Sequence, residues 1–66
     1  MTLTVNGNPV LLDSPVSLTD YLEQNQYRIA QIAIERNGEI LPKSRYAETL
    51  LKEGDVIEIV TFMGGG

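Results

Sequence analysis

The feature that most constrains the fold is a pattern that occurs twice in the chain: an alternating run of residues that ends in Asn-Gly. Thr2–Val5 precedes one such dipeptide at positions 6–7, and Ile32–Arg36 precedes another at positions 37–38. Alternation is typical of a strand that buries one face, and Asn-Gly tolerates the positive φ angles of tight hairpin turns. The sequence therefore predicts two β-hairpins.

The stretch between the hairpins carries one helix signal. Ser17 can cap a helix, and Leu18, Tyr21 and Leu22 then fall on one face at helical spacing. We expect a helix over residues 18–26. Because this helix has a single apolar stripe, it must pack against another layer.

The remaining segments predict further strands. Residues 9–12 begin at a proline, which favours an edge position, and residues 39–41 form a short return strand. Ser44 is expected to cap one irregular helical turn at 45–48. Residues 56–62, rich in β-branched side chains, form the strongest strand. Strands on both sides of one helix predict an α+β fold, in which a small mixed sheet has one covering helix.

The length of 66 residues predicts one small domain over positions 1–66, with a tail at 63–66. The chain contains no cysteine and no histidine, which excludes disulfide bonds, thiolate nucleophiles and metal centres built from these residues. The core must therefore stabilise the fold by itself. We expect it to contain Leu3, Val5, Leu18, Leu22, Ile32, Ile34, Leu50, Ile57 and Ile59.

Charge and hydropathy exclude several classes of partner. The net charge is -4 and the five basic residues are scattered, whereas nucleic-acid binding needs clustered Lys and Arg. The first dozen residues lack the pattern of a signal peptide, and no apolar run approaches the length of a membrane span. We expect a cytoplasmic protein with no nucleic-acid or membrane partner and with an acidic face for a more basic protein.

No catalytic constellation is found. Without histidine or cysteine, the candidate groups are carboxylates, lysines and hydroxyls. The charged pairs that spacing brings together are each explained more simply as solvated surface: Asp20 with Glu23, Glu35 with Glu58, and Lys43 with Arg45. An enzyme that acts unaided is therefore not expected.

Gly64, Gly65 and Gly66 follow the strongest strand almost directly. A glycine tail has no side chain to obstruct a narrow channel, its backbone is flexible, and its carboxylate stands clear of the folded body. Such a tail can be threaded into the active site of another protein. The simpler explanation, an idle terminus, fits less well where a strong strand leads into three glycines.

A terminal carboxylate has a pKa of about 3.3 to 3.7, so it is an anion and a poor electrophile at neutral pH. A function at Gly66 therefore needs a partner that activates this carboxylate, for which attachment of AMP from ATP is the simplest route. A nitrogen or sulfur nucleophile could then attack the terminal carbonyl. The chain would be a carried substrate, and its lack of catalytic groups would follow.

A series of motifs extends over the whole chain: Val5-Asn6-Gly7, Ser17-Leu18-x-x-Tyr21-Leu22, Asn37-Gly38-Glu39-Ile40-Leu41-Pro42-Lys43-Ser44, Gly54-Asp55-x-Ile57-Glu58-Ile59-Val60 and Gly64-Gly65-Gly66. Together they resemble the ThiS family of sulfur carriers in thiamine biosynthesis, which belongs to the ubiquitin-like β-grasp group. The turns are weak signals by themselves, whereas their order together with a terminal Gly-Gly is fairly specific.

The resemblance implies a cycle of activation and transfer. A ThiF-like adenylyltransferase would use ATP to form an acyl-adenylate on Gly66, and sulfur ultimately from cysteine, delivered by a sulfur-transfer protein, would convert it to a thiocarboxylate. A ThiG-like thiazole synthase would then take up the sulfur. Gly65 and Gly66 match the functional pair, Gly64 extends it, and no cofactor would be bound. The departures, Asn25 in the helix and Met63 before the glycines, concern packing.

Three other functions stay open at this point. A MoaD-like sulfur carrier of molybdopterin synthesis shares the fold and the Gly-Gly end, although such chains tend to be longer. A protein modifier that joins lysines would also act through Gly66. A β-grasp binding module would leave the tail idle.

Strand alternation predicts a docking surface. If alternate residues of the last strand face the helix, the residues that point to the other face are Val56, Glu58, Val60 and Phe62. Val60 and Phe62 then leave an apolar spot beside the tail. We expect this spot to dock the activating enzyme and the synthase. The alternative is that Ile40 or a crossing loop covers part of it.

Overall fold

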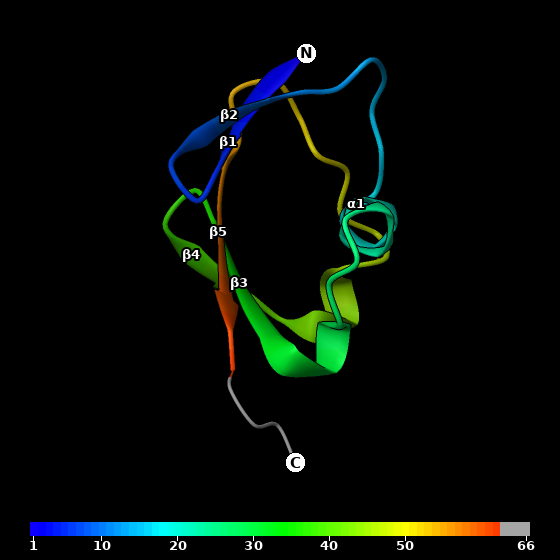
Figure 1. Cartoon of the computed structure of the whole chain (residues 1–66), viewed down its shortest axis with the longest axis vertical. Coiled ribbons are helices and arrows are strands. Elements are labelled where there is room, and N and C mark those ends of the chain that lie inside the picture. The colour runs from blue at the N-terminus through cyan, green and yellow to red at the C-terminus, as the bar shows by residue number, and fades with distance from the viewer. Residues whose placement is uncertain (63–66) are drawn as a thin grey trace.

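A mixed sheet of five strands lies against one α-helix in the computed structural model, which describes residues 1–62 (Figure 1). The α+β class and the single covering helix are as the sequence predicts. The predicted tail at 63–66 lies outside the described residues. The elements in chain order are β1 (Thr2–Val5), β2 (Asn8–Leu11), α1 (Leu18–Gln24), η1 (Ile29–Gln31), β3 (Ile32–Arg36), β4 (Glu39–Leu41), η2 (Lys43–Arg45) and β5 (Val56–Thr61).

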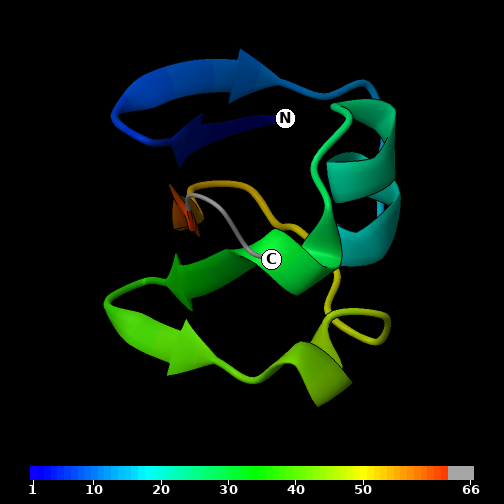
Figure 2. The same cartoon turned by 60° about the horizontal axis from the view of Figure 1, so that its bottom comes forward.

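The last strand, β5, is the central strand of the sheet, whose order is β2-β1-β5-β3-β4. It pairs parallel with β1 and antiparallel with β3, so the two predicted hairpins flank it (Figure 2). β2 forms one edge, which agrees with the position expected for a strand that contains Pro9. The strand that leads to the tail is therefore the central strand, with a hairpin on each side.

Helix α1 begins as predicted and ends two residues earlier. The Oγ of Ser17 accepts a hydrogen bond of 3.1 Å from the backbone N–H of Asp20, which is the expected N-cap. Asn25 is the C-cap residue, and its side-chain amide donates to the carbonyl of Tyr21 at 2.9 Å. Gln26 then adopts a φ of 64°, which stops the helix. The asparagine that departs from the family pattern therefore ends the helix.

The core lies between α1 and the inner face of the sheet, and one predicted member is wrong. Leu50 is 54% exposed, whereas Leu51 is 1% exposed. Leu50 pairs with Ser17 in an isolated β-bridge, and since neighbouring residues of extended chain point to opposite sides, Leu51 points inward. The observed core is Leu3, Val5, Leu18, Tyr21, Leu22, Ile32, Ile34, Tyr46, Leu51, Ile57 and Ile59.

The helical turn after β4 also differs from the prediction. It is a 3₁₀ turn over Lys43–Arg45 that starts after Pro42, and Ser44 lies inside the turn instead of capping it. Pro42 has a φ of -65°, the value that its ring imposes, so the chain is set for a turn at this point. Tyr46 follows the turn and is buried, which the sequence analysis missed.

Within residues 1–62, α1 and the other helical segments are too short, and not apolar enough, to serve as a bilayer-crossing helix.

Candidate functional site

The described chain ends beside η1, at one end of the sheet. Thr61 pairs with Ile32 in the last register position of β5 and β3, and the backbone N–H of Phe62 donates to the carbonyl of Gln31 at 2.7 Å. The backbone is therefore hydrogen-bonded up to Phe62. The predicted functional glycines, Gly64, Gly65 and Gly66, lie outside the described residues.

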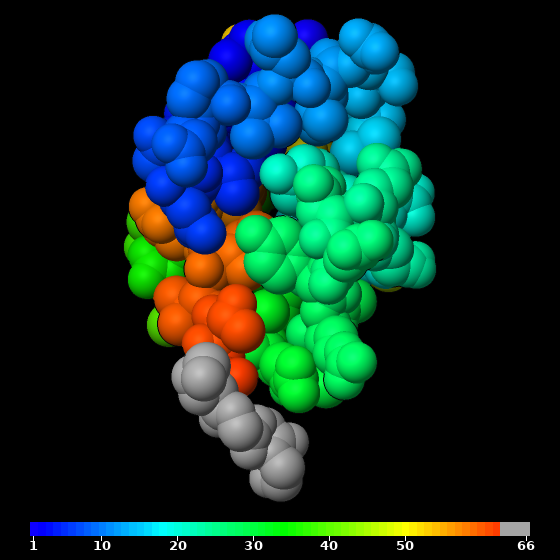
Figure 3. All heavy atoms as spheres, in the orientation of Figure 1, coloured from blue at the N-terminus to red at the C-terminus, as the bar shows by residue number. Residues whose placement is uncertain are grey.

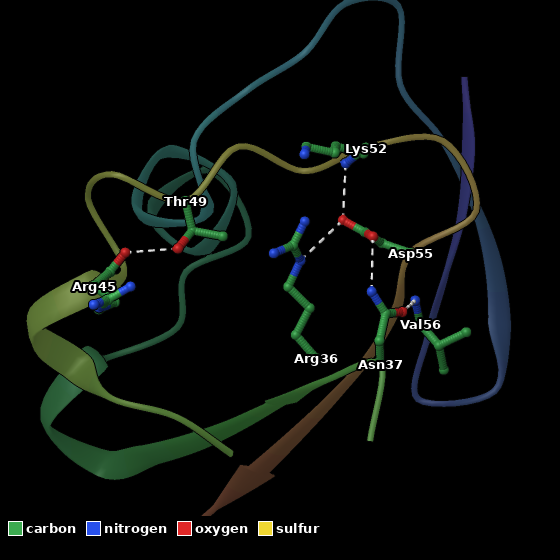
Figure 4. A network of polar contacts seen from close by, with 7 residues as sticks. All are labelled: Arg36, Asn37, Arg45, Thr49, Lys52, Asp55 and Val56. Carbon is green, nitrogen blue, oxygen red and sulfur yellow. Dashed lines mark hydrogen bonds and ion pairs between the residues drawn. The ribbon is translucent and has the colours of Figure 1, made fainter. Parts of the chain in front are cut away.

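The start of β5 is fixed by the carboxylate of Asp55, which is buried (Figure 4). Its Oδ2 accepts from the backbone N–H of Lys52 at 2.9 Å and from the Nε of Arg36 at 3.2 Å, and its Oδ1 accepts from the Nδ2 of Asn37 at 3.1 Å. Three donors from two separate segments thus converge on one carboxylate, which joins the turn before β5 to the end of β3.

Two opposing effects act on the ionisation of Asp55. Burial would raise the pKa of its carboxyl group, but the hydrogen bonds from Lys52, Asn37 and Arg36, together with the guanidinium charge, hold the pKa below its ordinary value. The carboxylate is therefore ionised at neutral pH. This is the behaviour of a structural group, since nothing here favours proton transfer near pH 7.

Both Asn-Gly turns attach to β5 through their asparagine side chains. The Oδ1 of Asn6 accepts from the N–H of Ile59 at 2.7 Å, and its Nδ2 donates to the carbonyl of the same residue at 3.3 Å. The Oδ1 of Asn37 accepts from the N–H of Val56 at 2.8 Å. The sequence analysis predicted these residues only as turn formers, so it missed their second role, which depends on partners far away in the chain.

The other face of β5 is open to solvent. Val60 is 53% exposed and Phe62 is 49% exposed, and Glu58 is exposed with them. Ile40 does not cover this surface, since it is itself 78% exposed. The space-filling view shows the C-terminal part of β5 at the surface, next to the point where the described chain ends (Figure 3). Val60 and Phe62 therefore lie at the end of the described chain, and Glu58 lies two residues before Val60 on the same strand.

We use the term outer face for the side of the sheet that points away from α1, and we define it by residues of β5, β3 and β4. They alternate in β3 and β5 with buried residues, which face α1, so they lie on the opposite side of the sheet. Figure 1 shows that α1 covers one face of the sheet. The outer face comprises Ala33, Glu35, Ile40, Val56, Glu58 and Val60.

A separate hollow of about 430 Å³ lies beneath the segment that follows β4. Its lining includes Arg36, Arg45 and Lys52, but the first two are already paired, with Asp55 at 3.2 Å and with Glu48 at 3.7 Å. Arg36 also sits at the opposite end of β3 from the residue that pairs with Thr61. The hollow is therefore a poor candidate for chemistry that involves the tail.

The part of the chain that the structure describes contains no group of three or more acidic, histidine or cysteine side chains that could hold a metal ion. Glu35 and Glu58, the charged pair expected on neighbouring strands, are direct partners in the register of β3 and β5. Asp20 and Glu23 both lie on the first two turns of α1, on the solvent-exposed side.

Comparison with known proteins gives a consistent result. The sequence model of the ThiS family matches residues 3–66. The sulfur carrier protein ThiS of Bacillus subtilis is 42% identical over 65 residues, with 97% of this chain and 98% of that protein covered. The crystal structure of a thiamine biosynthesis protein (ThiS) from Geobacter metallireducens superposes with a TM-score of 0.84 at 36% identity and covers 100% of both chains.

A longer relative shares the same stretch. A thiazole synthase of Paramagnetospirillum magneticum is 38% identical over 66 residues, which cover 100% of this chain. The chain spans 20% of the length of that synthase.

Proposed function

The chain belongs to the ThiS family, so it is a sulfur carrier of thiamine biosynthesis rather than a catalyst, and we propose that it carries the sulfur as a thiocarboxylate on Gly66. The observation that supports this proposal is the family match, which extends through the glycine tail to residue 66. A carrier needs a stable body and a reactive end. β5, hydrogen-bonded on both sides, supplies the body from which the tail continues.

The proposed chemistry follows from the state of the terminal carboxylate. At neutral pH it is an anion, and a nucleophile does not attack its carbonyl carbon at a useful rate. A carboxylate oxygen of Gly66 therefore attacks the α-phosphorus of ATP in the partner's active site, and pyrophosphate leaves. The outer sulfur of a persulfide on the sulfur-transfer protein then attacks the carbonyl carbon, and AMP leaves with one former carboxylate oxygen. A second thiol cleaves the resulting acyl disulfide, which frees the thiocarboxylate and leaves a disulfide on the donor side. The ATP belongs to the partner, and this chain binds no cofactor of its own.

We propose three partners for the cycle: a ThiF-like adenylyltransferase, a sulfur-transfer protein and a ThiG-like thiazole synthase. The thiazole synthase has support from two relatives of that name, which carry a similar stretch at 38% and 32% identity over 66 residues. A stretch of this kind within a synthase is expected if carrier and synthase act on the same sulfur. The cycle needs ATP, and the cytoplasm is the proposed location for that reason.

Docking on these partners is assigned to Val60, Phe62 and Glu58. Val60 and Phe62 are about half exposed, so a partner can cover them without disturbing the fold. The apolar area that is then removed from water favours binding by about 25 cal/mol per Å². Their position next to the end of the described chain suits a surface that must hold the body while the tail enters an active site.

The intact mass of the protein tests the proposal. The purified chain is incubated with ATP, the adenylyltransferase and a sulfur donor, and the expected product is heavier by the difference between sulfur and oxygen. A reaction without ATP is the control and should give no change. An unchanged mass in the complete reaction would contradict the proposal. An isopeptide bond from Gly66 to a lysine would identify a protein modifier, and rescue of molybdopterin synthesis instead of thiazole synthesis would identify a MoaD-like carrier.

A further inference from the structure

Two carboxylates, Glu35 and Glu58, face each other at the centre of the outer face. They are direct partners in the antiparallel register of β3 and β5, and both are exposed. Side chains opposite each other in such a pair have Cβ atoms about 4.5 to 5.5 Å apart, so two like charges there repel and destabilise the sheet. The pair therefore does not stabilise the fold, and a role in binding would explain its presence.

The described chain supplies no cation to neutralise the pair. Within residues 1–62, the ion pairs are Arg36 with Asp55 and Arg45 with Glu48. Arg36 follows Glu35 directly in β3, but its side chain points to the other side of the strand and meets Asp55 there. No residue of the outer face is a lysine or an arginine. The two negative charges are therefore free to interact with a positive charge from outside.

Apolar residues surround the two carboxylates. In the register of the sheet, Ala33 and Val60 form the pair on one side, and Ile40 lies directly opposite Glu35 on the edge strand. Val56 precedes Glu58 on the same side of β5. When a partner covers these side chains, water is excluded from around the carboxylates, and charge interactions there become stronger. The surface thus combines a charged centre with an apolar surround.

We infer that Glu35 and Glu58 together receive one arginine side chain of the partner protein when the outer face is covered. This inference rests on the docking surface proposed above and specifies the chemistry of the partner. A guanidinium group has a planar set of donors that can hydrogen-bond to two carboxylates at once, and its face packs well against apolar side chains. The arginine orients the carrier on its partner and speeds their association.

The test uses the double variant Glu35→Gln/Glu58→Gln and its binding to the adenylyltransferase and the thiazole synthase of the same organism. The affinity should fall by about tenfold or more for at least one of them, and the dependence of affinity on salt should become weaker. The midpoint of thermal unfolding should stay the same or rise, because the repulsion between the carboxylates is removed. The matched control is the double variant Asp20→Asn/Glu23→Gln on α1, which removes the same two negative charges on the opposite side of the molecule and should change affinity by less than about twofold.

A double variant that binds as tightly as the wild type, with the same salt dependence, would overturn the inference. So would a clear loss of thermal stability, since the pair would then be structural. Val60→Asp separates this failure from failure of the docking proposal. If Val60→Asp abolishes binding while the double variant binds normally, the partner binds the outer face without using the two carboxylates. If both bind normally, the docking proposal is wrong as well.

Discussion

The two ends of β5 are built in opposite ways. Toward its start, the buried carboxylate of Asp55 and the side chain of Asn37 form a cluster of hydrogen bonds, and Asn6 adds two more to Ile59, near the middle of the strand. At its end, Val60 and Phe62 expose about half of their surface and make no comparable polar contacts among the described residues. One end of β5 therefore contributes mainly to the stability of the fold, and the other end to partner binding. Changes at the start should act on folding, and changes at the end should act on partners.

The largest effect is expected from Asp55→Ala. The substitution leaves the partly buried donors of Lys52, Asn37 and Arg36 without their common acceptor, and the free energy of unfolding should fall by about 2 kcal/mol. Denaturant unfolding followed by circular dichroism measures this loss. Asp13→Ala, at an exposed aspartate, is the control and should change stability by less than about 0.5 kcal/mol. Equal effects of the two substitutions would mean that the start of β5 is not specially fixed.

Phe62→Asp should act at the other end, on binding. A charge in the apolar spot should weaken binding to the adenylyltransferase by about tenfold or more, which corresponds to about 1.4 kcal/mol, while the free energy of unfolding changes by less than about 0.5 kcal/mol. Leu50→Asp is a matched control, because Leu50 is exposed to a similar degree on a different surface. A loss of folding in the Phe62 variant would erase the distinction between the two ends.

Asn6→Ala should have a smaller effect on stability. The change removes the acceptor of the Ile59 N–H and the donor to its carbonyl, and it places alanine at a φ of 50°. We expect a loss of about 1 to 2 kcal/mol. Asn6→Gly, which tolerates the φ angle, separates the backbone strain from the lost side-chain bonds. If both variants were as stable as the wild type, the attachment of the first hairpin to β5 would not depend on this side chain.

The pH dependence of stability gives the finest comparison. The pKa of Asp55 in the folded protein lies below its ordinary value of 3.8, so this group stabilises the fold above that value and loses its contribution as the pH falls through the folded pKa. Unfolding curves should therefore show that the advantage of the wild type over Asp55→Asn shrinks on acidification below pH 3.8. A constant advantage down to the lowest pH would show that the ionised form is not what the cluster stabilises.

Local patterns of the sequence were sufficient to predict the regular elements. Alternation and the Asn-Gly dipeptides placed both hairpins, and Ser17 placed the start of α1, because each of these features depends on neighbours within a few residues. The segment between β4 and β5 has no period, so the inward position of Leu51 and the burial of Tyr46 could not be read from spacing. There, contacts with distant parts of the chain decide which side chains point inward.

The candidate site divides in the same way. The exposure of Val60 was predicted from alternation along β5, and Phe62, just after the strand, is also exposed as expected. The bond of Asn37 to Asp55 spans 18 residues, and that of Asn6 to Ile59 spans 53, so neither could be predicted from local motifs. The opposition of Glu35 and Glu58 also depends on the register between two strands, which the sequence left open.

The central claim is that the folded body serves to present a reactive end at Gly66. The most direct measurement is the rate of sulfur transfer into the thiazole product by a variant that lacks Gly65 and Gly66, with binding to the adenylyltransferase and the synthase measured on the same samples. The account predicts that transfer is abolished while folding is unchanged and binding to the outer face persists. Sulfur transfer at the wild-type rate by this variant would contradict it.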